Sequence, residues 1–191
     1  MKIRLVTYQS EGAINQLKST GVLKITKESE KLTHAGRDNS TNRPFDYGYR
    51  FMIYSMKEML PKTDDDITYP IWAWHRMRGK KPPIKRFDKM HEGNYRITFE
   101  IDEELVLLSD FDMFCYLLAG GLYFAYNEEE EAELSSHLFD DEKVYYYPNL
   151  RRMFDYKHER NNLFTASYQG MTIQATFWKL TIDQVIEIVK V

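Results

Sequence analysis

Residues 95–101 read YRITFEI, and this stretch, together with the LVLL of residues 105–108, decides the fold class. Apolar side chains fall at every second position of the first stretch, namely Tyr95, Ile97, Phe99 and Ile101. This period of two predicts a β-strand with one face on a core and a polar face opposite. The wholly apolar second stretch predicts a central strand buried on both faces.

Three other stretches have an extended pattern: residues 2–8, 22–25 and 172–180. Thr181 and Gln184 match a capping box, which predicts a short helical turn after the last of these strands. The chain then ends on the apolar segment 186–191, IEIVKV.

The clearest helix covers residues 45–60, because its apolar side chains recur on one face and Pro61 ends it. That face consists of Phe45, Tyr49, Met52, Ile53, Met56 and Leu60. A shorter helix is expected after Ser10, which is a favourable N-cap, and Gly21 is a natural end for it.

A third helix is expected after the apolar strand, with Ser109 as its cap. Asp110 and Asp112 suit the positive end of this helix, and Gly120 marks its end. The polar composition of residues 27–44 predicts a flexible loop, and residues 75–90 are expected to form a basic, proline-containing loop. The acidic run 128–133 is typical of a solvated helix face. Together these elements predict one α+β domain over residues 1–191.

The overall composition excludes several classes of protein. A net charge of −3 argues against a generally basic, nucleic-acid-binding surface, although a local patch remains compatible with it. Cys115 is the single cysteine, so no intramolecular disulfide can form, which suits a reducing compartment. No segment reads as a signal peptide or a membrane span. We therefore expect a cytoplasmic protein without a membrane partner.

The segment 75–91 is strongly basic and follows two tryptophans, Trp72 and Trp74. Its charged residues are Arg76, Arg78, Lys80, Lys81, Lys85, Arg86 and Lys89, against the one acid Asp88. Cations contact phosphates and indoles stack on bases, so the segment can bind a nucleotide or nucleic acid. The alternative is a solvated loop after a strand whose tryptophans belong to the core.

Other candidate chemistry is sparse. Asp110 follows a buried strand, where a carboxylate can line a cleft, but helix capping is by itself a sufficient explanation. The histidines form no paired metal-ligand motif, so no metal site is expected. The sequence has no glycine-rich phosphate loop, and Cys115 fits the apolar side of a helix better than a nucleophile's position.

Two stretches resemble DarT-like ADP-ribosyltransferases and their RNA-phosphotransferase relatives. Residues 6–8, VTY, lead through a helix to residues 18–23, KSTGVL, which is similar to the opening of that fold. Residues 173–178, IQATFW, resemble its late strand, which commonly contains Gln-Ala-Glu. The resemblance implies a mixed or antiparallel split sheet with flanking helices, and NAD bound between the first and last strands.

The resemblance also implies roles for particular residues. Thr176 stands where the family has its catalytic Glu, and a threonine cannot supply the negative charge. Alternation in this strand predicts that Gln174 and Thr176 face a cleft. Asp110 is then the candidate for a displaced catalytic carboxylate. The candidate cofactor-binding residues are Thr7, Gln9 and Gln174 for ribose or nicotinamide, Trp72 or Trp74 for ring stacking, and Arg76 for phosphate.

Over nearly its full length the chain also resembles an uncharacterised bacterial family known only as a domain of unknown function. The motifs that carry this resemblance are YPIWAW at 69–74, VLLSDF at 106–111, RMFD at 152–155 and QATFW at 174–178. Such families are often carried by phages and mobile elements, which implies a role in phage–host conflict.

The sequence thus leaves three hypotheses. The first is an ADP-ribosyltransferase-like domain that binds NAD or a related nucleotide and modifies a protein, RNA or DNA acceptor. The second is a non-catalytic interaction protein, either a phage-encoded inhibitor or an RNA-binding adaptor, that uses the basic segment. A hydrolase using Asp110 or Asp112 is the third.

Overall fold

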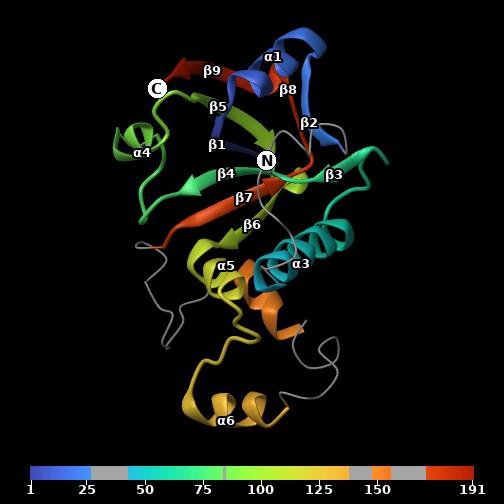
Figure 1. The fold of residues 1–191 in the computed structure, drawn as a ribbon, viewed down its shortest axis with the longest axis vertical. Coiled ribbons are helices and arrows are strands. Elements are labelled where there is room, and N and C mark those ends of the chain that lie inside the picture. Colours follow the sequence, from blue (N-terminus) through green and yellow to red (C-terminus); the bar gives the residue numbers. More distant parts are fainter. Residues whose placement is uncertain (27–42, 84, 138–147, 156–170) are drawn as a thin grey trace.

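The computed structural model describes residues 1–26, 43–83, 85–137, 148–155 and 171–191 (Figure 1). The predicted loop 27–44 lies outside the described residues, except that Arg43 and Pro44 already belong to helix α3 (Arg43–Met59). Within the described residues, none of the helices has the length and apolar character that crossing a membrane requires.

The strands form two antiparallel sheets, so the predicted α+β class is confirmed. The larger sheet has the order β6-β7-β4-β1-β5-β9, with bounds β1 (Lys2–Gln9), β4 (Ile71–Arg76), β5 (Tyr95–Asp102), β6 (Leu107–Asp110), β7 (Ile173–Phe177) and β9 (Val185–Lys190). The smaller sheet has the order β3-β2-β8, with bounds β2 (Val22–Thr26), β3 (Ile67–Tyr69) and β8 (Lys179–Thr181).

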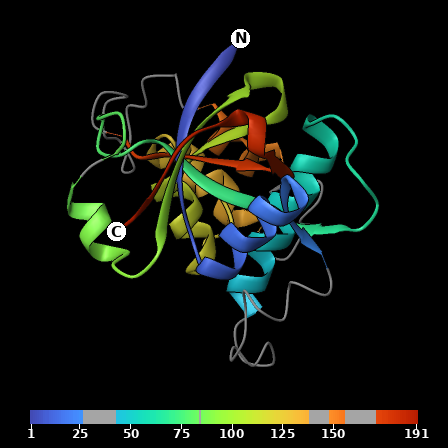
Figure 2. The same cartoon turned by 90° about the horizontal axis from the view of Figure 1, so that it is seen from above.

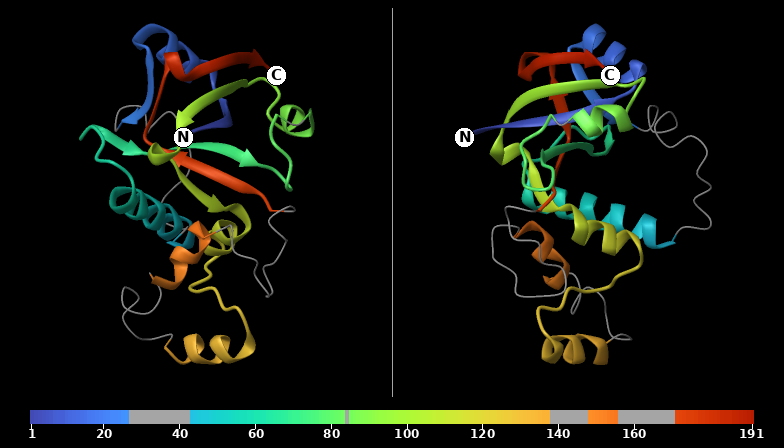
Figure 3. Two further views of the ribbon diagram at one scale, coloured as in Figure 1. Left: turned by 180° about the vertical axis from the view of Figure 1, so that it is seen from behind. Right: turned by 90° about the vertical axis from the view of Figure 1, so that its left-hand side faces the viewer.

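The larger sheet divides into two halves between β1 and β4. These strands share a single register pair, Val6 with Trp74, whereas β1 and β5 pair continuously along β1. The half-sheets β1-β5-β9 and β4-β7-β6 therefore lie in successive layers, as Figures 1 and 3 show.

A first core fills the space between the half-sheets. Phe99 of β5 and Phe177 of β7 have their ring centroids 5.2 Å apart although their strands are not neighbours in the sheet. The predicted apolar face of the 95–101 stretch is confirmed, because Ile97 and Phe99 are fully buried there. Helix α1 (Glu11–Thr20) adds Ile14 and Leu17 to this core.

Helix α1 begins and ends where the sequence predicts. The Ser10 side chain accepts from the backbone N–H of Ala13, and Gly21 closes the helix in the left-handed conformation at φ 76°. Gly21 can adopt this conformation without the steric cost that a Cβ atom would add.

A second core covers the other face of β4-β7-β6. Helix α3 contributes Phe51, Met52 and Met56, and α5 (Phe111–Leu118) packs beside it. The short helix η2 (Arg151–Phe154) lies against β6. Farther out, α6 (Glu128–Ser136) has no buried residue, which confirms the solvated acidic face (Figure 1).

Three sequence predictions are wrong in detail. Strand β6 lies at the edge of its sheet rather than in the centre. Its apolar run instead reflects burial of both faces, since Leu108 packs in the first core and Leu107 in the second. The cap of α5 is Asp110, while Ser109 is the preceding buried strand residue. The expected basic loop contains α4 (Lys85–Met90), which is short and buries no side chain, so it has little helical periodicity in its sequence.

The predicted strand 172–180 is two strands in different sheets. β7 ends at Phe177 and β8 begins at Lys179, so the chain changes sheets at Trp178. The Thr181–Gln184 capping box is confirmed in the 3₁₀ turn η3 (Ile182–Gln184), which leads into β9. Seen from above, α4 and the C-terminus lie together at one side of the molecule (Figure 2).

Candidate functional site

The late strand does not open onto a cleft. Gln174 is 3% exposed and donates to the Ser109 hydroxyl at 3.0 Å, and Thr176 is fully buried and donates to the Leu107 carbonyl at 3.3 Å. The prediction that this pair faces a cleft is wrong, because α3 and α5 pack on that face of β7.

The two tryptophans of β4 pack against protein side chains. The Trp72 ring lies 4.9 Å from Phe114, within the second core. The Trp74 ring lies 5.0 Å from Phe111 and 6.1 Å from Phe87, between α5 and α4. The alternative of structural tryptophans therefore accounts for both rings.

Thr7 and Gln9 lie where the half-sheets meet. The Thr7 hydroxyl donates to the Trp72 carbonyl at 2.6 Å and accepts from Gln9 Nε2 at 2.7 Å. This chain of bonds joins β1 to β4 beside the Val6–Trp74 pair. Both side chains thus have a structural function at the division of the sheet.

Asp110 and Arg76 also have protein partners. Asp110 is 2% exposed, and its carboxylate accepts from the backbone N–H groups of Asp112 and Met113 at 2.9 and 3.2 Å. Arg76 donates to the Gly79 carbonyl at 3.1 Å. The structure therefore does not bring the candidate catalytic and cofactor-binding residues together around one open site.

Six cations instead form an open surface at α4 and the turn before it. We call this surface the α4 patch, and it consists of Arg78, Lys80, Lys81, Lys85, Arg86 and Lys89. All six are exposed, and their side chains make no hydrogen bond or ion pair with the residues that the structure describes. The only acid of the segment, Asp88, instead contacts Tyr8 and Arg96.

A hollow of about 290 Å³ lies within this patch. Its apolar lining is Met77, Phe87 and Met90, and its cationic lining is Arg78, Lys80 and Arg86. Met77 is fully buried, whereas Met90 is 67% exposed at the open side. A flat apolar group can therefore enter the hollow while an attached anion contacts the surrounding cations.

Backbone hydrogen bonds hold one side of this hollow in place, and side-chain contacts hold the other. On one side, the Met77–Lys80 turn is closed by a 2.8 Å hydrogen bond from Met77 N–H to the Lys80 carbonyl. Gly79 N–H donates across the turn to the Met171 carbonyl at 2.9 Å. Arg78, with φ 50°, belongs to this fixed turn rather than to an unstructured loop.

On the other side, α4 is attached to β1 and β5 by polar contacts. The Tyr8 hydroxyl donates to Asp88, Arg96 pairs with Asp88 and Glu187, and the His91 ring stacks on Tyr8 at 4.1 Å. Partial burial and the Asp88 contact raise the pKa of Tyr8, and burial lowers the pKa of His91. These contacts give the α4 patch a defined position on the half-sheet β1-β5-β9.

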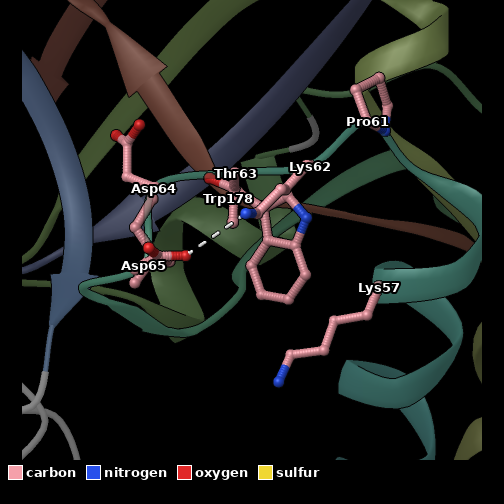
Figure 4. Close-up of a pocket in the computed structure, with 8 residues that line it drawn as sticks. Lys57, Pro61, Lys62, Thr63, Asp64, Asp65 and Trp178 are labelled. Atoms are coloured by element: carbon pink, nitrogen blue, oxygen red, sulfur yellow. Dashed lines mark ion pairs between the residues drawn. The ribbon is translucent and has the colours of Figure 1, made fainter.

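A second hollow, of about 280 Å³, lies where α3 ends and around Trp178 (Figure 4). It has no lining residue in common with the hollow at α4. Among the described residues, no group of three or more His, Cys, Asp or Glu side chains could hold a metal ion.

The cations of the α4 patch are evident in the sequence, whereas the apolar residues among them are not. Phe87 and Met90 are three positions apart, which is helical spacing, and this was the available signal for α4. The roles of Tyr8 and Trp178 depend on contacts with distant segments, so no local pattern could have revealed them.

Comparison with known proteins gives a family but no function. A family model described as "Domain of unknown function (DUF3841)" matches residues 4–186, which confirms the expected resemblance to an uncharacterised family. No curated protein and no solved structure matches the chain.

Proposed function

The chain belongs to the DUF3841 family, and we propose from its own geometry that it binds single-stranded RNA through the α4 patch. The observation that carries this proposal is the set of six exposed cations without carboxylate partners among the described residues, arranged around an apolar hollow. The chain as a whole has a net charge of −3, so the positive charge is concentrated locally.

Lysine and arginine side chains contact phosphates, and release of counterions from the strand provides much of the binding free energy. The ring of Phe87 and the side chains of Met77 and Met90 offer an apolar contact for one base. Single strands present unstacked bases that can enter such a hollow, whereas a duplex does not.

Anisotropy titration of a labelled oligonucleotide of about ten nucleotides, a length within the range of known single-strand sites, tests this proposal. Six phosphate contacts correspond to a slope of about −4 in log affinity against log salt, at roughly 0.7 per contact. The triple variant Arg78→Gln, Lys80→Gln, Arg86→Gln should reduce this slope by about 2.

The matched control is Lys2→Gln, Arg4→Gln, Lys18→Gln, which removes the same charge from exposed side chains away from α4 and should leave binding nearly unchanged. Equal weakening by both triple variants would show that only net charge matters and would refute a site at α4. Parallel titrations with single-stranded DNA and duplex RNA test whether binding depends on the 2′-hydroxyls and on an unpaired strand.

An ADP-ribosyltransferase-like domain that binds NAD is the second candidate. The observation that supports it is the division of the larger sheet at the Val6–Trp74 pair, with the polar side chains of Thr7 and Gln9 at the junction. ADP-ribosyltransferases have a catalytic Glu where this chain has Thr176. This candidate is therefore restricted to nucleotide binding unless another carboxylate, such as Asp110, takes the place of that Glu.

Incubation with labelled NAD and a lysate containing protein, RNA and DNA tests this second candidate. Transfer of label to any acceptor, reduced by Gln9→Ala but not by the α4 triple variant, would support it. Intact NAD after incubation would refute the transferase activity and leave the RNA proposal unaffected.

A further inference from the structure

We infer that the hollow at Trp178 is a separate binding site for a nucleoside monophosphate. Its lining comes from three places in the sequence: the end of α3 with Lys57, the following segment from Pro61 to Asp65, and the bend at Trp178. Ile67 of β3 completes it. The volume of about 280 Å³ is near the lower end of small-molecule sites, roughly 300 to 1,000 Å³.

Trp178 provides the surface for a base. Figure 4 shows its indole between the Pro61–Thr63 segment and the side chain of Lys57. The residue is 7% exposed, so its ring is held by the second core and turns only a small area to the hollow. Its Nε1–H has no hydrogen-bond partner among the described residues and is not a buried atom, so a ligand can reach it.

A second donor without a partner is the Thr63 hydroxyl. Its Oγ1 atom is buried and makes no hydrogen bond in the described part of the chain. Buried hydroxyls are normally satisfied, so this atom indicates a position where a ligand oxygen belongs. Thr63 also lines a smaller adjoining hollow of about 80 Å³, and Trp178 and Lys179 are among the other residues that line it.

Lys57 and Lys62 supply positive charge for the phosphate. Lys57 is exposed and has no carboxylate partner among the described residues. Lys62 lies 3.9 Å from Asp65, but both side chains are about nine-tenths exposed, at 88% and 95%, so this pair restrains Lys62 little. Both cations are therefore available to an anion.

The two carboxylates of the hollow decide between a nucleotide and a simple anion. Asp64 pairs with Lys179 at 3.3 Å, whereas Asp65 has only the weak pair with Lys62. These groups weaken the binding of any anion, and a simple anion makes no further contact that would compensate for this. Ribose hydroxyls and the amino group of a base instead donate hydrogen bonds, and a carboxylate accepts them. A nucleoside monophosphate therefore matches the indole, the two cations and the exposed Asp65 carboxylate together.

Isothermal titration with AMP, GMP, CMP and UMP tests this inference, with adenosine, ribose 5-phosphate and inorganic phosphate as partial ligands. We expect at least one of the four nucleotides to bind, and each partial ligand to bind at least about tenfold more weakly, one such factor being 1.4 kcal/mol. Lys57→Gln and Thr63→Val should each weaken nucleotide binding, whereas Lys18→Gln, an exposed lysine elsewhere, should not.

Absence of binding by all four nucleotides at millimolar concentration would overturn the inference. Inorganic phosphate binding as tightly as the best nucleotide would overturn it as well, because the indole would then contribute nothing. The α4 triple variant should keep its nucleotide affinity, and Lys57→Gln should keep its RNA affinity. The two sites can therefore fail independently in these measurements.

Discussion

The Tyr8 hydroxyl donates to Asp88 Oδ1 at 2.8 Å, which connects the first strand to α4 across 80 positions of the sequence. This contact turns the only acid of the basic segment towards the half-sheet, where Arg96 pairs with it. The six cations of the α4 patch are therefore left without a nearby carboxylate of their own segment.

Removal of the Tyr8 hydroxyl should loosen α4. We expect Tyr8→Phe to lower the free energy of unfolding by about 1 to 2 kcal/mol, since the bond to a carboxylate is lost while the ring still stacks on His91. Urea unfolding measures the change. Tyr54→Phe is the matched control, because its bond to Glu58 is exposed and should matter less. Equal losses in both variants would contradict this role for Tyr8.

The Phe87 ring should contribute to RNA affinity independently of charge. Because stacking on an aromatic ring contributes roughly 1 to 3 kcal/mol per base, we expect Phe87→Leu to weaken binding by about tenfold or more. The salt slope should not change, since no cation is removed. Anisotropy titration at several salt concentrations checks both expectations, with Tyr54→Leu as control. A reduced slope with unchanged affinity would be the opposite of the expected result.

Asp110 should behave as a helix cap. Asp110→Ala should reduce stability by about 0.5 to 2 kcal/mol, because two backbone N–H groups at the start of α5 lose their acceptor. Asp110→Asn keeps an acceptor oxygen and should cost less, which chemical unfolding can measure. Similar losses in both variants would instead point to a requirement for the negative charge.

His91 should make stability depend on pH. Burial against Tyr8 holds the pKa of His91 below its ordinary value of 6.5, and Asp88 offsets only part of this effect. The folded state then binds fewer protons than the unfolded state, so this contribution is complete above about pH 6.5 and is lost as the pH falls. As the pH is lowered from about 7.5 to 5.5, the urea midpoint of unfolding should decrease more steeply for the native protein than for His91→Gln. If the urea midpoints of the two proteins change with pH in parallel, His91 is not the source of the pH dependence.

Local signals in the sequence were sufficient for most elements. Alternation in residues 95–101 identified the buried face of β5, and Ser10 and Gly21 marked both ends of α1. The apolar face of residues 45–60 indicated α3. These features depend on backbone geometry and on neighbours within a few positions, which the sequence contains directly.

Alternation alone could not decide what covers each face of a strand. The pattern at Gln174 and Thr176 is the same whether that face meets solvent or two helices, and here α3 and α5 cover it. For the same reason the apolar residues 105–108 indicated burial of both faces but not the edge position of β6.

The sequence by itself therefore determined the class of the fold, most helix and strand positions and the concentration of cations in residues 75–91. Only the tertiary structure decided which polar residues are buried, how Asp88 is turned away from those cations, and where the hollows at Phe87 and Trp178 form. The physical reason is that the hollow at Trp178 joins side chains from segments far apart in the chain, and the hollow at Phe87 depends on contacts that attach α4 to the distant residues Tyr8 and Arg96. Their meeting depends on the packing of all the layers together rather than on any local pattern.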